Sequence, residues 1–266
     1  MQEVDLHSLL DSAINASIKA GDEIMKIYDT SFEVKAKEDD SPLTIADKNS
    51  NAIIEKALKI SKIPFLSEEG KDIPYNERKK WDYLWIVDPL DGTKEFIKKN
   101  GEFTVNIALV KKQKPILGVI YVPCKNELYY ALEGLGAFKV TIDGSYKGLE
   151  SLLKNSSKLP LNQYRSNYIV VGSRSHMSKE TQNYFDKKKK EYDSVKVLAV
   201  GSSLKICMVA EGKADAYPRY APTMEWDTAA GHAIANMAGF KIIEYNSYNE
   251  ITYNKKELLN PWFLVS

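Results

Sequence analysis

Residues 85–96 read WIVDPLDGTKEF, an apolar run that is followed at once by two carboxylates. The first three residues have the composition of a buried strand, and Asp88 and Asp91 stand where that strand ends. Pro89 restricts the conformation of the turn between the two acids. Like charges held close together destabilise a fold unless a cation lies between them. The stretch therefore predicts a strand that positions two acids to bind one metal ion.

Further acids occupy strand ends or helix starts elsewhere in the chain. Glu68 and Glu69 follow a brief apolar strand, while Asp227 opens a predicted helix and Asp47 lies near the start of another. Taken singly, the glutamates fit a solvated turn, and the aspartates fit the preference of helix N-termini for negative charge. Taken together, they can converge on one cleft. A set of oxygen ligands without nearby His or Cys favours a hard cation, Mg²⁺ above all.

The turn after the apolar run offers more than two carboxylates. The carbonyl of Leu90 would point toward the same metal, Gly92 allows a close bend, and the hydroxyl of Thr93 could hold or polarise a water. A tight turn closed by Asx-type hydrogen bonds is the alternative explanation for these residues. Two or three Mg²⁺ ions in such a site would lower the pKa of water and neutralise a leaving oxygen, which is the chemistry of two-metal phosphate hydrolysis.

The composition excludes several broad classes of protein. The 266 residues are 44% apolar, which is enough for one large core or two lobes. With 37 Lys+Arg against 36 Asp+Glu, the net charge of +1 argues against a general nucleic-acid or membrane-surface binder. Two distant cysteines in apolar surroundings indicate free thiols, and the N-terminus lacks the features of a secretory signal. With no long apolar stretch, these features predict a cytoplasmic protein without a membrane span.

Hydrophobic periodicity divides the chain into two differently patterned parts. We expect an N-terminal α+β lobe at residues 1–150 and a C-terminal α/β lobe at 151–266, with a loop or boundary around 143–162. In the first part the pattern predicts two amphipathic helices and several strands, at 6–27, 32–37, 45–60, 64–66, 83–87, 103–111, 115–123, 128–132 and 136–140. In the second part strands and helices alternate, at 168–171, 179–189, 195–199, 202–211, 214–217, 226–238 and 241–244.

Three motifs in register resemble the signatures of one phosphatase family. They are SEEG at 67–70, DPLDGT at 88–93 and WDTAAG at 226–231. In order and spacing they resemble the inositol monophosphatase-like superfamily, and the resemblance extends from the first helix to about residue 245. It implies a lithium-sensitive, magnesium-dependent phosphomonoesterase. The implied fold is α+β, a layered αβαβα sandwich of the sugar/inositol phosphatase type with the active site between two lobes.

The resemblance also implies roles for individual residues. The positions that match the family's metal ligands are Glu68, Asp88, the carbonyl of Leu90, Asp91 and Asp227. Glu69 and Thr93 match the residues that orient the nucleophilic water, and Asp47 matches the acid that hydrogen-bonds the threonine. The resemblance implies two or three Mg²⁺ ions per site and no covalent phospho-enzyme.

Motifs in the C-terminal part resemble the branch of this superfamily that hydrolyses the 3′-phosphate of adenosine 3′,5′-bisphosphate to give AMP. They are GSRSH at 172–176, GSSLK at 201–205 and PTMEWD at 222–227. A Gly-Ser-Ser loop at a helix N-terminus offers N–H groups to an anion, and Lys205 adds a positive charge. The implied substrate contacts are Glu68, Leu90, Asp91, Gly92, Thr93, Ser173, His176, Gly201, Lys205 and Asp227, with Arg174 and Ser202 as weaker candidates.

Other functions stay open on the sequence alone. A phosphatase for inositol phosphate or a sugar bisphosphate on the same scaffold is one alternative. A nucleotide- or metal-sensing protein on a decayed phosphatase fold is another, although the complete set of acids speaks against it. 3′-Phosphoadenosine 5′-phosphosulfate is a candidate second substrate. We expect a small-molecule substrate and no nucleic-acid partner, and we leave open the oligomeric state and peripheral association with the inner face of the cell membrane.

Overall fold

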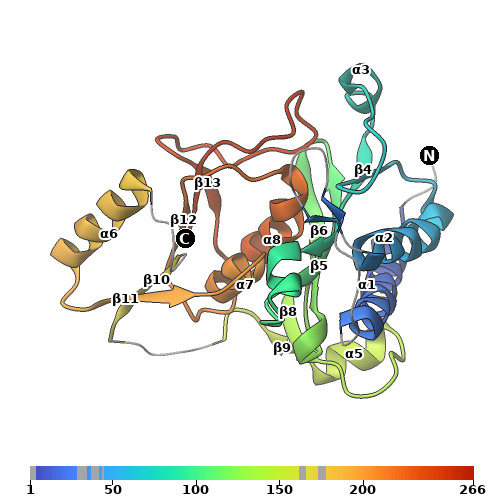
Figure 1. Ribbon diagram of the computed structural model, residues 1–266, viewed down its shortest axis with the longest axis horizontal. Coiled ribbons are helices and arrows are strands. Elements are labelled where there is room, and N and C mark those ends of the chain that lie inside the picture. The colour runs from blue at the N-terminus through green and yellow to red at the C-terminus, as the bar shows by residue number, and fades with distance from the viewer. Residues whose placement is uncertain (1–3, 29–34, 37–41, 44, 162–165, 173–177) are drawn as a thin grey trace.

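The computed structural model describes residues 4–28, 35–36, 42–43, 45–161, 166–172 and 178–266, and its elements stack in five layers (Figure 1). Helices α1 (Leu6–Tyr28) and α2 (Ile45–Leu58) cover one face of a seven-stranded sheet. Helix α8 (Glu225–Met237) covers the other face, with α7 (Leu204–Ala210) beside it. A second group of strands and α6 (Lys179–Glu191) complete the layers. The layered αβαβα sandwich predicted from the resemblance is confirmed.

The large sheet is a meander with one parallel edge. Its strand order is β3-β4-β5-β6-β7-β8-β9. Strand β3 runs parallel to β4, and each later pair of neighbours is antiparallel, so the order along the sheet follows the order along the chain. The bounds are β3 Phe65–Ser67, β4 Tyr83–Asp91, β5 Thr104–Lys111, β6 Lys114–Val122, β7 Glu127–Leu132, β8 Gly136–Thr141 and β9 Ser157–Lys158.

Strand β4 is longer than the apolar run that predicts it. It begins at Tyr83 as expected but continues to Asp91, so both acids lie on the strand and not after it. Its register against β5 shifts between Asp88 and Asp91, where Pro89 has no N–H to donate to a neighbouring strand. The strand therefore passes through the acidic turn as an irregular segment, which the end of the apolar run does not predict.

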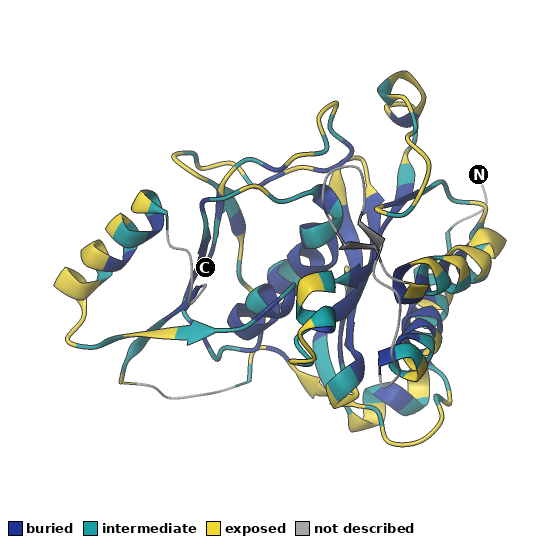
Figure 2. Cartoon of the chain, viewed as in Figure 1, coloured by how far each residue is buried: buried dark blue, intermediate teal, exposed yellow. Residues whose placement is uncertain are grey.

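Both faces of the large sheet are covered, so the protein has a core on each side of it. Along β4, Trp85 and Val87 pack toward α1 and α2, whereas Leu84 and Ile86 pack toward α8. In Figure 2 the buried residues gather along the strands and on the helix faces that are turned toward them. Because successive side chains of a strand point to opposite faces, a strand buried on both faces has an uninterrupted apolar run.

Helix α8 packs very close to the sheet at Gly118 of β6. A Cβ atom at Gly118 would lie 2.9 Å from the Cβ of Ala233 and would also collide with the carbonyl oxygen of Ala230. Ala230 of the WDTAAG motif and Ala233, two residues beyond the motif, provide the helix side of this contact. This packing fixes the position of the helix whose first turn carries Asp227.

The second group of strands has a parallel part and an antiparallel part. Strands β10 and β11 are parallel, as the predicted alternation of strands and helices requires, and β14 lies between β12 and β13, antiparallel to both. A bridge between Val170 and Ala216 joins the two parts. The bounds are β10 Tyr168–Gly172, β11 Val195–Ala199, β12 Tyr217–Arg219, β13 Ile242–Glu244 and β14 Phe263–Val265.

Some segments differ from the elements that we expected. The region 143–162, expected as a loop, contains helix α5 (Leu149–Asn155), whose leucines pack against the core beneath α1, and strand β9. Helix α4 (Thr93–Ile97) and strand β14 were not predicted, because elements this short carry too few residues to show a period. The division of the chain at residue 150 stays a prediction, and β9, which lies beyond it, pairs with β8 of the large sheet.

The remaining elements are short. Strand β1 (Lys35–Ala36) pairs with β2 (Pro42–Leu43), α3 (Tyr75–Arg78) lies in the loop before β4, and 3₁₀ turns span Lys59–Ser61 and Pro123–Lys125. The other residues of the strand expected at 32–37 lie outside the described residues. Among the described helices, none is both long enough and apolar enough to cross a membrane.

Candidate active site

Three aspartates from two distant parts of the chain meet at one end of the large sheet. Asp88 and Asp91 come from β4, and Asp227 comes from the first turn of α8. One carboxylate oxygen from each residue lies within 4.8 Å of the other two. Because α8 packs directly on β4 and β5, its first turn lies beside the acidic end of β4.

Burial and mutual repulsion make the charged forms of Asp88 and Asp227 unfavourable. Asp88 is 1% exposed, and its pKa is raised well above the usual value by burial and then by the neighbouring acids, Glu68 first. The pKa of Asp227 is raised to about 7, first by burial and then by the charge of Asp91. A cation between the carboxylates would relieve both effects. The cluster is therefore better suited to binding a metal ion than to stabilising the fold.

The Asp91 carboxylate is oriented by three hydrogen bonds to a single oxygen. Its Oδ2 accepts the backbone N–H of Ser203 at 2.6 Å and lies 2.7 Å from the Ser203 hydroxyl. The side-chain amide of Asn106, on the neighbouring strand β5, also donates to Oδ2, at 3.3 Å. These bonds hold the carboxylate in one orientation and leave Oδ1 outside all three of them.

The turn that follows Asp88 is held from two sides. The N–H of Leu90 donates to Oδ1 of Asp88 at 3.1 Å, which is the Asx-type bond considered from the sequence. From α2, the hydroxyl of Ser50 donates to the carbonyl oxygen of Pro89 at 2.7 Å. Gly92 has φ +95°, a left-handed conformation that suits glycine, and α4 begins at the next residue. The turn is therefore both a closed Asx turn and a rigid support for the acids.

Thr93 and Asp47 face each other across this turn. The Thr93 hydroxyl lies 3.4 Å from Oδ2 of Asp47 and 3.4 Å from the carbonyl oxygen of Leu90. Both distances are long for a hydroxyl donor, so the hydroxyl is shared between two acceptors and held firmly by neither. Asp47 is 3% exposed on the first turn of α2. The structure thus brings together the threonine and the acid that the resemblance pairs.

Glu68 and Glu69 follow β3, the parallel neighbour of β4. The N–H of Glu68 donates to the carbonyl oxygen of Val87 at 3.2 Å, so the chain continues alongside β4 for one more residue. The Glu68 side chain is exposed, and its charge raises the pKa of both Asp88 and Asp227. Glu69 is partly buried in the same turn. Parallel strands end at the same edge of a sheet, which brings these glutamates to the aspartates.

A cavity of about 400 Å³ opens beside the aspartates. Asp91 and Asp227 line it together with Glu95, Ser202 and three cations, Lys94, Lys205 and Arg219. Burial lowers the pKa of Lys205, Asp91 opposes that shift, and Arg219 adds to it. The charges of Lys205 and Arg219 repel each other, so an anion bound between these two side chains would stabilise both. The cavity therefore combines an acidic side with a basic side.

Arg219 is the site residue that the sequence reasoning missed. It closes β12, and within the described part of the chain its buried Nε has no hydrogen-bond partner. One terminal nitrogen donates to the carbonyl oxygen of Pro222 at 3.0 Å. The strand expected at 214–217 ends two residues too early to include Arg219. The alternation of Tyr217 and Arg219, which both line the cavity, was the available signal.

The predicted substrate contacts have different outcomes. Ser173, Arg174 and His176 lie outside the described residues, so their contacts stay predictions. Gly92, Ser202 and Lys205 line the cavity. Gly201 is buried next to it, and a Cβ there would lie 2.8 Å from the carbonyl oxygen of Glu102, so the loop passes too close to its neighbour for a side chain.

The donor set fits a hard divalent cation. Asp88, Asp91 and Asp227 provide only oxygen, and the carbonyl of Leu90 and the carboxylate of Glu68 lie in the adjoining turns. The two cysteines are elsewhere, with Cys207 buried in the core and Cys124 partly buried. Oxygen ligands of this kind suit Mg²⁺, Mn²⁺ or Ca²⁺ better than a softer metal.

This fold and this acidic site define a class of protein. The model of the inositol monophosphatase family matches residues 5–261, and the chain belongs to this family, whose members depend on metal ions. A 3′(2′),5′-bisphosphate nucleotidase CysQ of Shigella flexneri is 43% identical over 264 residues, which cover 97% of this chain and 99% of the relative. The protein of the same name from Escherichia coli K12 is 41% identical over 264 residues, with the same coverage.

Solved structures agree with this assignment. CysQ from Bacteroides thetaiotaomicron, described as a bacterial member of the inositol monophosphatase family, matches with a TM-score of 0.91 and 50% identity over 99% of this chain and 98% of that one. The extragenic suppressor protein suhB from Bartonella henselae matches with a TM-score of 0.74 and 26% identity, covering 96% of this chain and 93% of that one.

Proposed function

We propose that the protein removes the 3′-phosphate of adenosine 3′,5′-bisphosphate in a Mg²⁺-dependent reaction with water, releasing AMP and phosphate. The observation that carries the proposal is that Lys205 and Arg219 line the same cavity as Asp91 and Asp227. A substrate with two phosphates needs one anion at the acidic, metal-binding side and a fixed basic partner for the other. The names of the relatives, both bisphosphate nucleotidases, support the same substrate class.

We assign the metal ligands as the sequence predicts them, with two or three Mg²⁺ ions held by Glu68, Asp88, the Leu90 carbonyl, Asp91 and Asp227. Bound Mg²⁺ would stabilise the phosphoryl oxygens as a Lewis acid and lower the pKa of water. The closeness of the three aspartate oxygens and the raised pKa of Asp88 support this assignment.

The chain's own residues would orient the reactants. When the Thr93 hydroxyl donates to Asp47, one of its two acceptors, a lone pair of the threonine oxygen is left to accept a hydrogen bond from a water. Glu69 is the second residue that we assign to this water. Ser202 and Lys205, with Arg219, would hold the 5′-phosphate and so fix the distance between the 3′-phosphate and the acids.

The alternative functions differ in whether they give Lys205 and Arg219 a role. Inositol monophosphate carries one phosphate and offers no second anion to Lys205 and Arg219, whereas a sugar bisphosphate would offer one. A sensing protein without activity would not need Thr93, Asp47 and Glu69 beside the acids. 3′-Phosphoadenosine 5′-phosphosulfate also carries a 5′-anion, so we keep it as a second candidate substrate.

The test is a phosphate-release assay on the purified full chain with and without Mg²⁺. The substrates are adenosine 3′,5′-bisphosphate, 3′-phosphoadenosine 5′-phosphosulfate, inositol 1-phosphate and fructose 1,6-bisphosphate. We expect Mg²⁺-dependent release with the highest kcat/KM on the adenosine bisphosphate. A higher kcat/KM on inositol 1-phosphate or the sugar bisphosphate would overturn the substrate assignment, and no release from any substrate would overturn the enzymatic one.

A further inference from the structure

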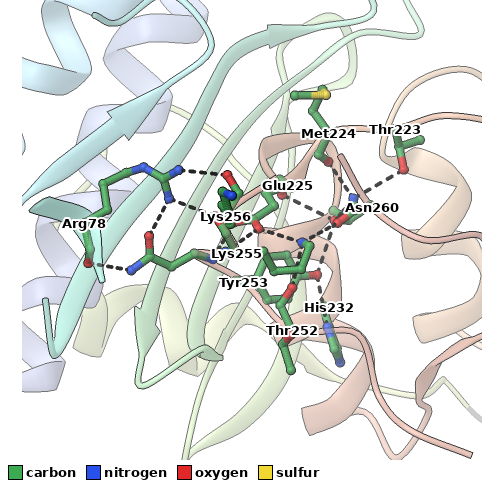
Figure 3. Close-up of polar contacts among 12 residues, drawn as sticks. Arg78, Thr223, Met224, Glu225, His232, Thr252, Tyr253, Lys255, Lys256 and Asn260 are labelled. Atoms are coloured by element: carbon green, nitrogen blue, oxygen red, sulfur yellow. Dashed lines mark hydrogen bonds and ion pairs between the residues drawn. The ribbon is translucent and has the colours of Figure 1, made fainter. Parts of the chain in front are cut away.

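Figure 3 shows a buried polar network around Glu225, and one of its members, Thr223, also lines the cavity. The centre of the network is Glu225, the first residue of α8, whose side chain is 0% exposed. The carboxylate accepts the backbone N–H groups of Asn254, at 2.5 Å, and Lys255, at 3.0 Å. The Lys255 ammonium also lies 2.6 Å from it. A buried carboxylate is thus held by a charged partner and by two N–H groups from one segment of the C-terminal region.

Arg78 attaches a different part of the chain to that same segment. It lies at the end of α3, in the loop that joins the Glu68–Glu69 turn to β4, and is 3% exposed. Its guanidinium donates to Oδ1 of Asn254 at 2.8 Å and to the carbonyl oxygen of Lys255 at 3.1 Å. The side-chain amide of Asn254 donates back to the carbonyl oxygen of Arg78 at 2.8 Å. The contact is therefore reciprocal.

Within its own loop, Arg78 also restrains the backbone that follows the glutamates. Its Nε donates to the carbonyl oxygen of Ile73 at 2.9 Å, and the N–H of Gly70 donates to the carbonyl oxygen of Ser67 at 3.0 Å. One bond fixes the backbone at Gly70 and the other fixes it at Ile73, so the two residues between them are held at both ends. The Glu68 turn is thereby connected, through one loop, to the segment that binds Glu225.

The turn that leads into α8 is held on its outer side by Asn260. The Asn260 amide donates to the carbonyl oxygen of Met224 at 2.7 Å, and its backbone N–H donates to the carbonyl oxygen of Thr223 at 2.8 Å. On the inner side, the N–H of Met224 donates to Oδ2 of Asp227 at 2.8 Å. The backbone of Met224 therefore contacts Asn260 of the network on one side and the Asp227 carboxylate on the other, so it couples the position of the network to that of the carboxylate.

We infer that Glu225 and Arg78 are positioning residues for the metal site: through Asn254 and Lys255 they hold the Asp227 turn in register with the loop that carries Glu68. Neither residue lines the cavity. The inference rests on the proposed function, in which Asp227 and Glu68 are metal ligands. Residues that orient metal ligands from behind typically change metal affinity or activity 10–100-fold when substituted.

The test measures metal binding and not only turnover. The first variant, Glu225→Gln, keeps the shape of the side chain but removes its charge. The second, Arg78→Lys, keeps the positive charge but loses the planar guanidinium that donates several hydrogen bonds at once. Mg²⁺ binding to the metal-free full chain is followed by isothermal titration calorimetry. We expect each variant to weaken Mg²⁺ binding about 10-fold. Kinetically, kcat at subsaturating Mg²⁺ should fall and be restored by excess Mg²⁺, with little change in the substrate KM.

A matched control is available in Glu211, another buried glutamate, which is 1% exposed and pairs with Lys139 and Lys213 away from the acids. Glu211→Gln should lower the melting temperature and leave Mg²⁺ affinity unchanged. Equal loss of Mg²⁺ affinity in this control would mean that affinity merely follows stability, which overturns the inference. Should Glu225→Gln fail to fold, Arg78→Lys alone decides between the two outcomes.

Asp227→Asn separates this inference from the proposed function. If Asp227→Asn weakens Mg²⁺ binding and Glu225→Gln and Arg78→Lys do not, the positioning role is wrong and the metal site stands. If Asp227→Asn has no effect on Mg²⁺ binding, the proposed metal ligand itself is wrong. If all three weaken binding while Glu211→Gln does not, both statements are supported.

Discussion

Asp91 and Ser203 lie 112 positions apart in the chain, and the N–H of Ser203 donates to Oδ2 of Asp91 over 2.6 Å. The Ser203 hydroxyl lies 2.7 Å from the same Oδ2 and also 2.7 Å from the backbone carbonyl oxygen of Asp227. One serine thus contacts both acid-bearing elements, β4 and α8, and it stands at the edge of the basic side of the cavity. The acidic side and the basic side of the cavity therefore meet at Ser203.

Asp88→Asn should abolish Mg²⁺-dependent phosphate release, because the residue is central to the acid cluster. The same change should raise the melting temperature of the metal-free protein, since it removes a buried negative charge from among like charges. Scanning calorimetry in EDTA and in Mg²⁺ measures both effects. Mg²⁺ should stabilise the wild type and leave the variant almost unchanged. Asp82→Asn, at an exposed residue before β4, is the matched control.

Arg219→Gln and Lys205→Gln should each lower kcat/KM for adenosine 3′,5′-bisphosphate by roughly 10–100-fold, as expected for the loss of a charge-assisted bond to phosphate. Against 3′-AMP, which lacks the 5′-phosphate, the same variants should lose much less. Steady-state kinetics on the two substrates measure the difference. Lys196→Gln, at an exposed lysine of β11, should behave as wild type. Equal losses on both substrates would contradict a 5′-phosphate site.

Thr93→Ala should lower kcat roughly 10²-fold or more and change the KM little, because the hydroxyl is assigned to the attacking water and not to substrate binding. Thr93→Ser keeps the hydroxyl beside Asp47 and should recover most of the rate. The comparison of kcat and KM across the two variants is the measurement. A rise in KM at constant kcat would instead place Thr93 among the substrate contacts.

Glu211 should make the fold sensitive to acid. Burial alone would raise its pKa, but hydrogen bonds from Lys213 and Tyr129 and the charge of Lys139 outweigh burial, and the pKa is lowered below 4.5. A carboxyl group whose pKa is lowered on folding adds stability above its unfolded-state pKa and loses it as the pH falls through its folded-state pKa. The free energy of unfolding should therefore decline below about pH 4.5.

Glu211→Gln measures the size of this effect. At pH 7 the variant should be roughly 1.5–3 kcal/mol less stable, because the hydrogen bonds from Lys139 and Lys213 to the charged carboxylate are lost. Below pH 4 the difference between variant and wild type should shrink. Urea unfolding at the two pH values gives both free energies. A difference that stays constant with pH would show that the Glu211 carboxyl does not titrate differently in the folded state.

Gly118→Ala should destabilise the fold by about 1–3 kcal/mol, because the added methyl group would collide with the backbone of α8. The displacement of α8 should also reduce Mg²⁺ affinity, since that helix carries Asp227. Gly172→Ala is the control, because its Cβ would meet only ordinary contacts, at 3.6 Å or more. Thermal unfolding and Mg²⁺ titration of the two variants test the prediction.

Most of the fold follows from local patterns. The helices α1 and α2 and the strands from β5 to β8 begin and end close to the expected residues, because each apolar pattern extends over enough residues to show its period. The short elements α4, β9 and β14 were missed. Strands β9 and β14 are formed by pairing with strands elsewhere in the chain, and α4 packs its Phe96 against Tyr28 of α1. The extension of β4 through Pro89 has the same origin, since β5 holds that strand.

By itself, the sequence determined the kind of site. The two acids around Pro89 and the Gly-Thr that follows them form a local pattern, and together with the acids of the other two motifs this pattern predicts a metal site. Only the tertiary structure decided which distant groups complete it. Arg219 reaches the cavity, and Arg78 and Glu225 reach the Asp227 turn, through pairings and hydrogen bonds between remote segments. Such contacts depend on how strands and helices pack, and no spacing along the chain encodes them.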